Sequence, residues 1–461
     1  MSMTATKLPP PTREQPKTSP WRWGTIGETG RYINGVAFRP SDWTGEGLPI
    51  IRIQNLTDSS KPLNRTRRKV DDIYQVEPGD LLVSWSATLD AFIWDREPAL
   101  LNQHIFKVVP NSSVVTKRFL FYLLRLAIAD MIKSEHLHGS TMKHINRGPF
   151  LAHSVPIPPL EEQRRIVAEI EKQFTRLDAG VASLERVQTA LKRYRASVLK
   201  AAGEGRLVLT EAELARKENR SYETGEQLLQ RIRNQRRTRY QGGRRYREPS
   251  PPDDLPLSQI PEGWTFATAE QLSDPSRTIT YGVIKLGPNT SDGISVLRSS
   301  DVRHLRIDLH GVKQISPSIA ANFGRTLLHG EEVVLTVRGT LGGVAVVPRN
   351  CEGFNISREV AMIALVEPKL ANFVATMIAS SPLQHWLLRR AKGIAYTGIN
   401  IETLKQLPIP IPPLTEQQRI VIEVERRLSI TNEVGAAVLD QLRRVKPFRR
   451  ALLERAFSSH L

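Results

Sequence analysis

Hydrophobic residues recur every seven positions along two distant stretches of the chain. In the first stretch the series is Ile170, Leu177, Leu184, Leu191 and Val198, with Phe174, Val181, Val187 and Tyr194 between them. In the second it is Val424, Val438, Val445 and Leu452, with Thr431 as a gap. A sustained seven-residue repeat is typical of a coiled coil, whose apolar stripe needs a partner helix. We therefore predict an intramolecular coiled coil; the alternative is that each helix packs only on its own domain.

A duplicated segment opens both predicted helices. PIPPLEEQRRIV at 156–167 returns as PIPPLTEQQRIV at 410–421, an offset of 254 residues. Over 156–171 against 410–425 only four positions differ, so 12 of 16 match, and the offset runs without a gap to the C-terminus. This predicts two copies of one unit. Thr415 with Gln418 is expected to form a capping box at the start of the second helix.

Outside the two long helices the pattern predicts mixed α and β structure. Strands are expected at 48–56, 80–85 and 105–109, bounded by turn residues such as those at 77–80. The stretch 118–133 is apolar almost throughout and predicts a buried helix. Gly203 to Gly205 is expected to end the first long helix, and residues 224–227 to cap a short helix in the following segment.

The stretches before each long helix share a weaker correspondence. Residues 51–56 resemble 297–302, 82–88 resemble 334–340, and 102–104 resemble 356–358; Gly139 and 145–146 match Gly393 and 399–400. Two domains with one framework and different surfaces are suited to reading two different targets.

These patterns divide the chain into six parts. They are a disordered tail at 1–20, a first domain at 21–155, a long helix at 156–207, a basic arginine-rich linker with a short helix at 208–250, a second domain at 251–409, and a C-terminal long helix at 410–461. The predicted fold class is α+β: two similar mixed α/β domains joined by two long coiled-coil helices, with a pseudo-twofold internal repeat.

The charge of the chain points to a polyanionic partner. The net charge is +18 and the pI about 10.1, which favours nucleic acid; an acidic protein partner is the alternative. Cys351 is the single cysteine, which fits a reducing cytoplasm. Residues 1–20 lack the apolar core of a signal peptide, and no apolar run is long enough to span a membrane.

The densest positive charge lies in the 208–250 segment. Its arginines include Arg231, Arg233, Arg236, Arg237, Arg239, Arg244, Arg245 and Arg247. Arginine forks pair with phosphate oxygens, so we expect this segment to bind a nucleic-acid backbone. The alternative is a solvated, mobile linker.

Catalytic motifs are missing from the sequence. It contains no P-loop, and the glycines at 339–343 lack the dinucleotide-binding spacing. Glu367-Pro368-Lys369 is only a weak match to a nuclease motif, and His136 with His138 lacks the cysteines or carboxylates of a zinc site. We therefore expect a non-catalytic chain that depends on partners for chemistry.

The paired P-I-P-P-L-x-E-Q-x-R-I-V segments, together with the frameworks at 50–56, 79–86, 102–104 and 356–358, resemble the DNA-specificity subunit of Type I restriction–modification systems. The resemblance implies two target recognition domains, held apart by two antiparallel spacer helices, that read a bipartite asymmetric DNA site. It also implies docking of two methyltransferase (modification) subunits and two restriction (translocase and endonuclease) subunits in defence against foreign DNA. S-adenosylmethionine, ATP and Mg²⁺ would belong to those partners, and this chain would bind no cofactor.

Candidate DNA-binding residues follow from the chemistry of base reading, in which Arg takes guanine and Asn or Gln takes adenine. They are Arg52, Gln54, Asn55, Lys143 and His144 in the first domain, Arg298, Arg338, Arg358, Tyr396 and Thr397 in the second, and Arg236, Arg237, Arg244 and Arg245 in the basic segment. Three alternatives stay open: a coiled-coil adaptor that does not bind DNA, a self-contained nuclease, and an orphan or alternate specificity subunit.

Overall fold

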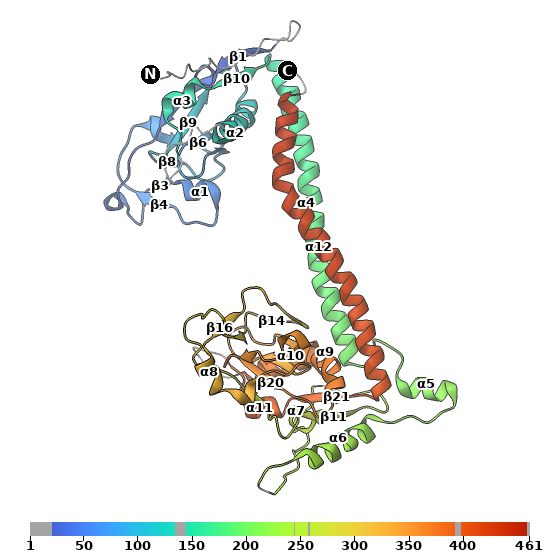
Figure 1. Ribbon diagram of the computed structural model, residues 1–461. Helices are drawn as coiled ribbons and strands as arrows, with labels where there is room; N and C mark the ends of the chain where they lie inside the picture. Colours follow the sequence, from blue (N-terminus) through green and yellow to red (C-terminus); the bar gives the residue numbers. More distant parts are fainter. Residues whose placement is uncertain (1–20, 134–143, 244, 257–258, 392–397, 459–461) are drawn as a thin grey trace, which may run out of the picture. The chain divides into compact units, whose positions relative to one another are not determined.

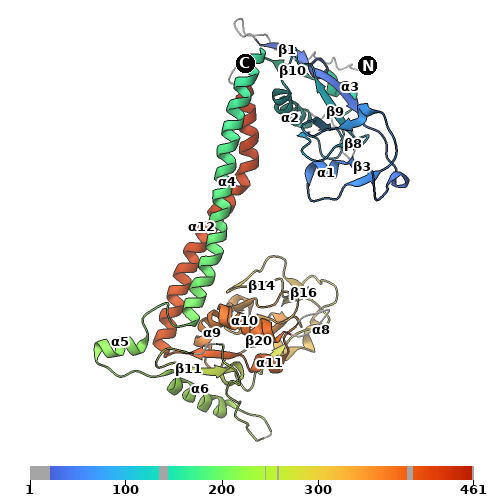
Figure 2. The same cartoon turned by 180° about the vertical axis from the view of Figure 1, so that it is seen from behind.

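The computed structural model describes residues 21–133, 144–243, 245–256, 259–391 and 398–458. It divides into two compact units, the first built from residues up to 185 with 440–461 and the second from residues 186–439. Two long helices, α4 (Leu160–Gly203) and α12 (Leu414–Ser458), contribute to both units (Figures 1 and 2). The predictions at Gly139, Lys143, Arg244, Gly393, Tyr396 and Thr397 lie outside the described residues.

The body of the first unit, its part outside α4 and α12, combines two four-stranded sheets with three helices, of which α2 (Lys117–Lys133) has the most residues. The antiparallel sheet has the order β2 (Gly30–Asn34), β9 (Ile105–Pro110), β6 (Leu81–Ser84), β7 (Asp90–Ile93), and the mixed sheet the order β4 (Asn64–Thr66), β3 (Leu48–Ile51), β8 (Ala99–Leu101), β5 (Gln75–Val76). The helices are α1 (Ile53–Thr57), α2 and α3 (Arg147–Ala152), and β1 (Arg22–Thr25) pairs with β10 (Ser154–Ile157). The apolar α2 contributes eight buried residues, as its sequence predicted.

The body of the second unit repeats this plan with more helices. Its sheets have the orders β12 (Thr280–Tyr281), β20 (Val360–Ile363), β17 (Val333–Thr336), β18 (Val344–Val346) and β16 (Lys313–Ile315), β13 (Ile294–Leu297), β19 (Asn355–Ile356), with the pairs β14 (Val302–Arg303)–β15 (Arg306–Ile307) and β11 (Thr265–Thr268)–β21 (Pro408–Ile411). Its helices are α5 (Glu211–Glu218), α6 (Gly225–Arg239), α7 (Ala269–Leu272), α8 (Pro317–Ala321), α9 (Ala371–Ala379), α10 (Ser381–Arg390) and α11 (Ile401–Lys405).

Strand registers show which residues of the two bodies are equivalent. Ile51 pairs in parallel with Leu101, and Leu297 pairs in parallel with Ile356. The isolated parallel bridges Val36–Asn102 and Val283–Ser357 follow one residue later in both bodies. The predicted match of 51–56 with 297–302 is therefore confirmed at its start. The match of 102–104 with 356–358 is wrong by one residue, because Asn102 corresponds to Ser357.

Within each unit, α4 and α12 pack along the predicted seven-residue stripe. In the first unit Ile170 and Phe174 of α4 belong to the same core as Leu453 and Phe457 of α12. In the second, Val198 of α4 shares a core with Ile420 and Val424 of α12. All five predicted α4 positions are fully or partly buried, whereas Val187 and Tyr194 are exposed. The stripe is thus the inward face of a helix pair, as predicted.

Thr431 fills the gap in the α12 series. It is buried, and its hydroxyl donates to the carbonyl oxygen of Arg427 at 2.7 Å. This local hydrogen bond satisfies the one polar side chain in the α12 series, so the stripe continues through it.

Three local predictions are wrong. The predicted long helices at 156–207 and 410–461 begin too early, because residues 156–157 belong to strand β10 and residues 410–411 to strand β21. The chain leaves the strand after Ile51 and forms helix α1, because the side-chain oxygen of Asn55 accepts the backbone N–H of Arg52 at 3.1 Å and turns the chain. The second long helix begins at Leu414, so Thr415 lies inside its first turn and is not the cap. By contrast, the box of Thr224 and Gln227 at the start of α6 is present.

The 208–250 segment is part of the second unit's body and not a mobile linker. Leu228, Leu229 and Ile232 of α6 are buried in its core. At the start of α12 the buried carboxylate of Glu416 accepts the backbone N–H of Glu211 at 2.8 Å and the indole N–H of Trp264 at 2.9 Å. Burial raises the pKa of Glu416. The segment therefore packs against the N-terminal end of α12.

Two isoleucines of α12 test how much the helix packing contributes. Ile420 is fully buried and Ile422 is 64% exposed, two residues away. We expect Ile420→Ala to lower the free energy of unfolding by about 2–5 kcal/mol, because it leaves a cavity in the core. Ile422→Ala should change it little. Urea denaturation of both variants measures the difference, and equal midpoints would contradict the described packing.

Candidate nucleic-acid interface

Polar and aromatic side chains gather in the first unit where β6 ends and β9 begins. The indole N–H of Trp85 donates to the side-chain oxygen of Asn34 at 3.1 Å, and its ring lies 5.1 Å from the ring of His104. The side chain of Gln103 lies 3.1 Å from a ring nitrogen of His104 and is exposed. Ser86 forms a bridge to His144, which brings the chain before α3 to the same place. We call this cluster the first-unit tip.

The equivalent residues of the second unit form a cluster of different chemistry. The Arg338 guanidinium lies 5.2 Å from the centre of the Tyr281 ring, and both Arg338 and Arg358 are exposed. The hydroxyl of Ser299 donates to Glu359 at 2.7 Å. Arg338 also bridges Gly398, as Ser86 bridges His144 in the other unit. We call this cluster the second-unit tip.

The backbone after β6 and β17 is strained in the same way in both tips. Ala87 has a φ of +57° and its counterpart Gly339 a φ of +73°. A left-handed conformation costs a non-glycine residue about 1–2 kcal/mol, so Ala87 is held there by its surroundings. Such strain is common where a loop is shaped for binding.

Neither tip, built from described residues, contains a cluster of metal-ligating side chains. Among the residues that the structure describes, no group of three or more His, Cys, Asp or Glu could hold a metal ion. The exposed groups are donors, acceptors and aromatic faces, which suit the recognition of base edges and phosphates. In the described parts of the chain, no helix is both long and apolar enough to cross a membrane.

The structure places some of the predicted DNA-binding residues in the tips and others elsewhere. His144, Arg338 and Arg358 lie in the tips. Asn55 is a correction: it is buried, and its amide donates to the carbonyl oxygens of Lys61 and Pro62. It holds the α1 turn and cannot reach a base.

Three further candidates lie directly after equivalent strands. Arg52 and Gln54 follow β3, and Arg298 follows β13. Arg298 donates to both carboxylate oxygens of Asp301 at 3.1 Å and to the carbonyl oxygen of Gly311, so its guanidinium stabilises a turn. Arg52 lies over the ring of Trp43 at 5.3 Å. Gln54 is exposed on α1.

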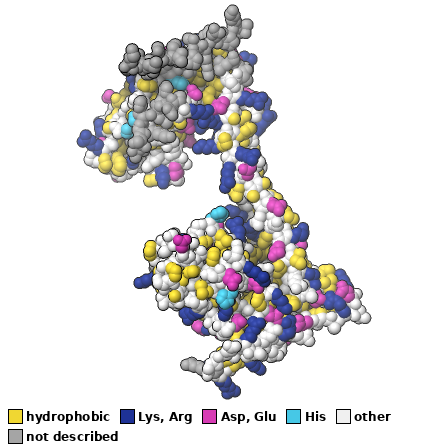
Figure 3. Space-filling view, viewed as in Figure 1, with side chains coloured by type: hydrophobic (Ala, Val, Ile, Leu, Met, Phe, Trp, Pro, Cys, Tyr) yellow, Lys and Arg dark blue, Asp and Glu magenta, His cyan; other side chains and the backbone are white. Residues whose placement is uncertain are grey.

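The basic segment contains both buried and exposed arginines. Arg236 is a correction, because it is 6% exposed and donates to the Ser273 carbonyl at 3.1 Å and the Tyr246 hydroxyl at 2.8 Å. Arg237 is largely exposed but pairs with Glu248 at 3.2 Å. Arg245 is exposed. Lys and Arg side chains are frequent on the surface of this part of the second unit, in dark blue in Figure 3.

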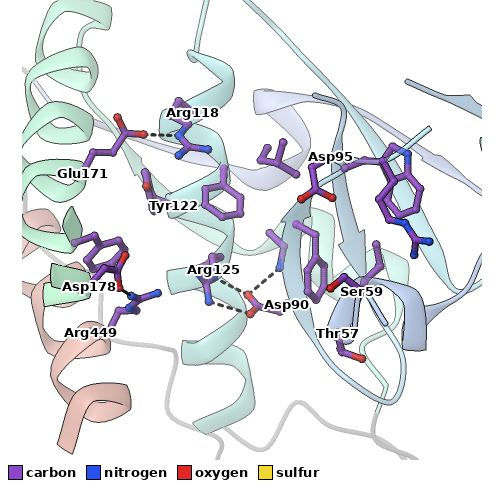
Figure 4. A pocket seen from close by; sticks show the side chains of 18 of the residues that line it. Thr57, Ser59, Asp90, Asp95, Arg118, Tyr122, Arg125, Glu171, Asp178 and Arg449 are labelled. Atoms are coloured by element: carbon purple, nitrogen blue, oxygen red, sulfur yellow. Dashed lines mark hydrogen bonds and ion pairs between the residues drawn. The ribbon is translucent and has the colours of Figure 1, made fainter. Parts of the chain in front are cut away.

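The first unit also contains a hollow of about 780 Å³ between α2, β7 and the long helices. Figure 4 shows that its charged side chains face one another. Arg125 donates to both oxygens of Asp90 at 3.0 and 3.1 Å, while Arg118 pairs with Glu171 and Arg449 with Asp178. These three paired arginines form a charged seam along the hollow. Arg118 with Glu171 joins α2 to α4, Arg125 with Asp90 lies within the body, and Arg449 with Asp178 joins the two long helices.

The fold and the two tips together define a recognition protein with two like modules. The chain belongs to the Type I restriction modification DNA specificity domain family, whose model matches residues 19–186 and again residues 280–443. The family description names DNA specificity, in agreement with the prediction of a non-catalytic recognition subunit. The chain therefore associates with DNA and with other restriction–modification subunits.

Individual relatives agree with this assignment. The chain is 27% identical to the Type I restriction enzyme EcoBI specificity subunit of Escherichia coli, over 96% of this chain and 86% of the relative. It is 21% identical to the MjaVIII specificity subunit of Methanocaldococcus jannaschii, over 92% and 90%. A chain solved in a study of complex assembly and conformational transition of the type I R-M system has the same fold, with a TM-score of 0.57 at 19% identity, covering 97% of this chain and all of that one.

Sequence reasoning missed several residues of the tips as candidate readers. These are Asn34, Trp85, Gln103, His104, Tyr281 and Glu359. A usable signal was present at one place: Gln103 is a hydrophilic residue in a short break between two apolar strands, which marks an exposed turn.

The strain at the tips can be tested by exchanging glycine and alanine. Gly339→Ala is expected to lower the free energy of unfolding by about 1–2 kcal/mol, because alanine resists a positive φ. Ala87→Gly relieves the same strain but increases the freedom of the unfolded chain, so a change near zero is expected. Thermal or urea unfolding measures both, and an undiminished stability of Gly339→Ala would contradict the described backbone.

The exposed and buried arginines of the basic segment should behave differently. We expect Arg245→Glu combined with Arg247→Glu to weaken binding to duplexes of any sequence and to reduce the salt slope by roughly 0.9 for each phosphate that is no longer neutralised. Arg236→Ala should instead lower stability by about 1–3 kcal/mol, because the buried Ser273 carbonyl and the half-buried Tyr246 hydroxyl lose their donor. Binding titrations from low to high salt measure the first effect, and a slope identical to that of the unmodified chain would place the segment away from DNA.

Proposed function

We propose that this chain reads a bipartite, asymmetric site in double-stranded DNA, one half with each unit. The observation that carries the proposal is the pair of tips, in which one framework presents different exposed side chains at equivalent positions. Two copies of one reader with identical tips would favour a symmetric site, whereas different tips favour two unlike half-sites. The net charge of +18 supports a polyanionic partner.

The chain would supply recognition, and its partners the chemistry. Two modification subunits would dock on the chain and methylate adenine with S-adenosylmethionine, and two restriction subunits would add ATP- and Mg²⁺-dependent translocation and cleavage. This chain would bind none of these cofactors. The helix pair would set the number of base pairs between the half-sites, since α4 alone has 44 residues, about 66 Å at 1.5 Å per residue.

Methylation mapping of a host that carries this chain with its cognate modification subunit tests the proposal. We expect a split adenine-methylated motif that appears only with this chain. Replacing residues 208–409 by those of a relative should change one half of the motif and leave the other half intact. The exchange includes 208–250 because Leu228, Leu229 and Ile232 belong to the core of the second unit. If the two proteins associate but no motif appears, the chain is not the reader.

A further inference from the structure

We infer that Gln103 and Arg358 are equivalent base-reading positions, Gln103 for an adenine in one half-site and Arg358 for a guanine in the other. The inference rests on the proposed function and adds to it the base type that each unit selects.

The equivalence of the two positions follows from strand register. Leu101 and Ile356 occupy the same place in parallel ladders with Ile51 and Leu297. Gln103 lies two residues after Leu101, and Arg358 lies two residues after Ile356, so the two residues are equivalent. The neighbouring ladders agree, because Val83 pairs with Phe106 and its counterpart Leu335 pairs with Ala361. Gln103 lies three residues before Phe106, and Arg358 lies three residues before Ala361, so the two residues are again equivalent.

The turn that carries each residue is held rigidly by the backbone. The N–H of Ile105 donates to the carbonyl oxygen of Asn102 at 3.1 Å, and the N–H of Val360 donates to that of Ser357 at 3.0 Å. The residues on either side are buried in both units: Leu101 and Ile105 in the first, and Ile356 and Val360 in the second. Each turn thus holds an exposed polar side chain on a rigid backbone.

Ser86 and Arg338, a second equivalent pair in the tips, are not matched in exposure. Arg338 is exposed, whereas its counterpart Ser86 is 4% exposed. The backbone of Ser86 is also occupied, because its carbonyl oxygen accepts the hydroxyl of Ser84 at 3.0 Å. Gln103 and Arg358, by contrast, are polar side chains that are exposed in both units.

The side chains at this position have the chemistry of two different bases. The amide of Gln103 offers donor and acceptor groups, which match N7 and N6 of adenine in the major groove. The guanidinium of Arg358 offers two parallel donors, which match O6 and N7 of guanine. Among the described residues, no carboxylate pairs with Arg358, and the neighbouring Glu359 accepts from Ser299 at 2.7 Å. The Arg358 fork is thus available for a ligand.

Reciprocal substitution tests the inference in the complex with the modification subunit. We expect Gln103→Arg to change one adenine of one half-site to guanine, and Arg358→Gln to change one guanine of the other half-site to adenine. Methylation mapping gives both motifs. Binding selection from randomised duplexes with Gln103→Ala and Arg358→Ala gives a second readout, in which discrimination should fall on the order of 10- to 100-fold at one position only for each variant.

Two matched variants control for charge. Ser112→Arg adds a positive charge beyond the far end of β9, and Arg349→Gln removes an exposed arginine that pairs with Glu331. Neither should alter a base preference. If the unmodified chain yields a split motif and both alanine variants keep every base preference, the inference is overturned and the proposed function stands. If the unmodified chain yields no motif, the proposed function fails and the inference with it.

Discussion

Neither long helix can be stable alone in water, because each exposes charged residues on most of its surface and gains stability only by burying one apolar stripe. In the first unit the stripe of α4 is covered by α2 and the end of α12, and the ring of Phe119 lies 5.3 Å from that of Phe457. In the second unit it is covered by the start of α12 and the body. Each recognition body is therefore anchored to a helix pair through its own core, so that the helices serve as part of both folds.

The same framework carries two unlike tips because its buried residues set the strand register, whereas its exposed residues are free to differ. Strand pairs such as Ile51 with Leu101 and Leu297 with Ile356 set the register in each body. The turns between those strands and the next differ in charge, with Gln103 and His104 in one unit and Arg358 and Glu359 in the other. The charged seam of Arg118, Arg125 and Arg449 has a different role, because each of these arginines is neutralised by a carboxylate.

Much of the fold was predictable, since long-range repetition and a seven-residue period depend on many residues at once. The predicted strand at 48–56 was wrong after Ile51, because one side chain, Asn55, turns the chain there. Arg236 could not be distinguished from its exposed neighbours by sequence, because its burial depends on Ser273 and Tyr246. Gln103 was overlooked as a reader because only the strand register aligns it with Arg358, and the sequence match placed that alignment one residue away.

The rigid turns with an exposed side chain have an evolutionary consequence. Gln103 and Arg358 contribute little to either core, so substitutions there carry almost no penalty in folding. A lineage that must recognise new invaders can therefore explore base preferences by single codon changes, without altering the buried residues that maintain the fold.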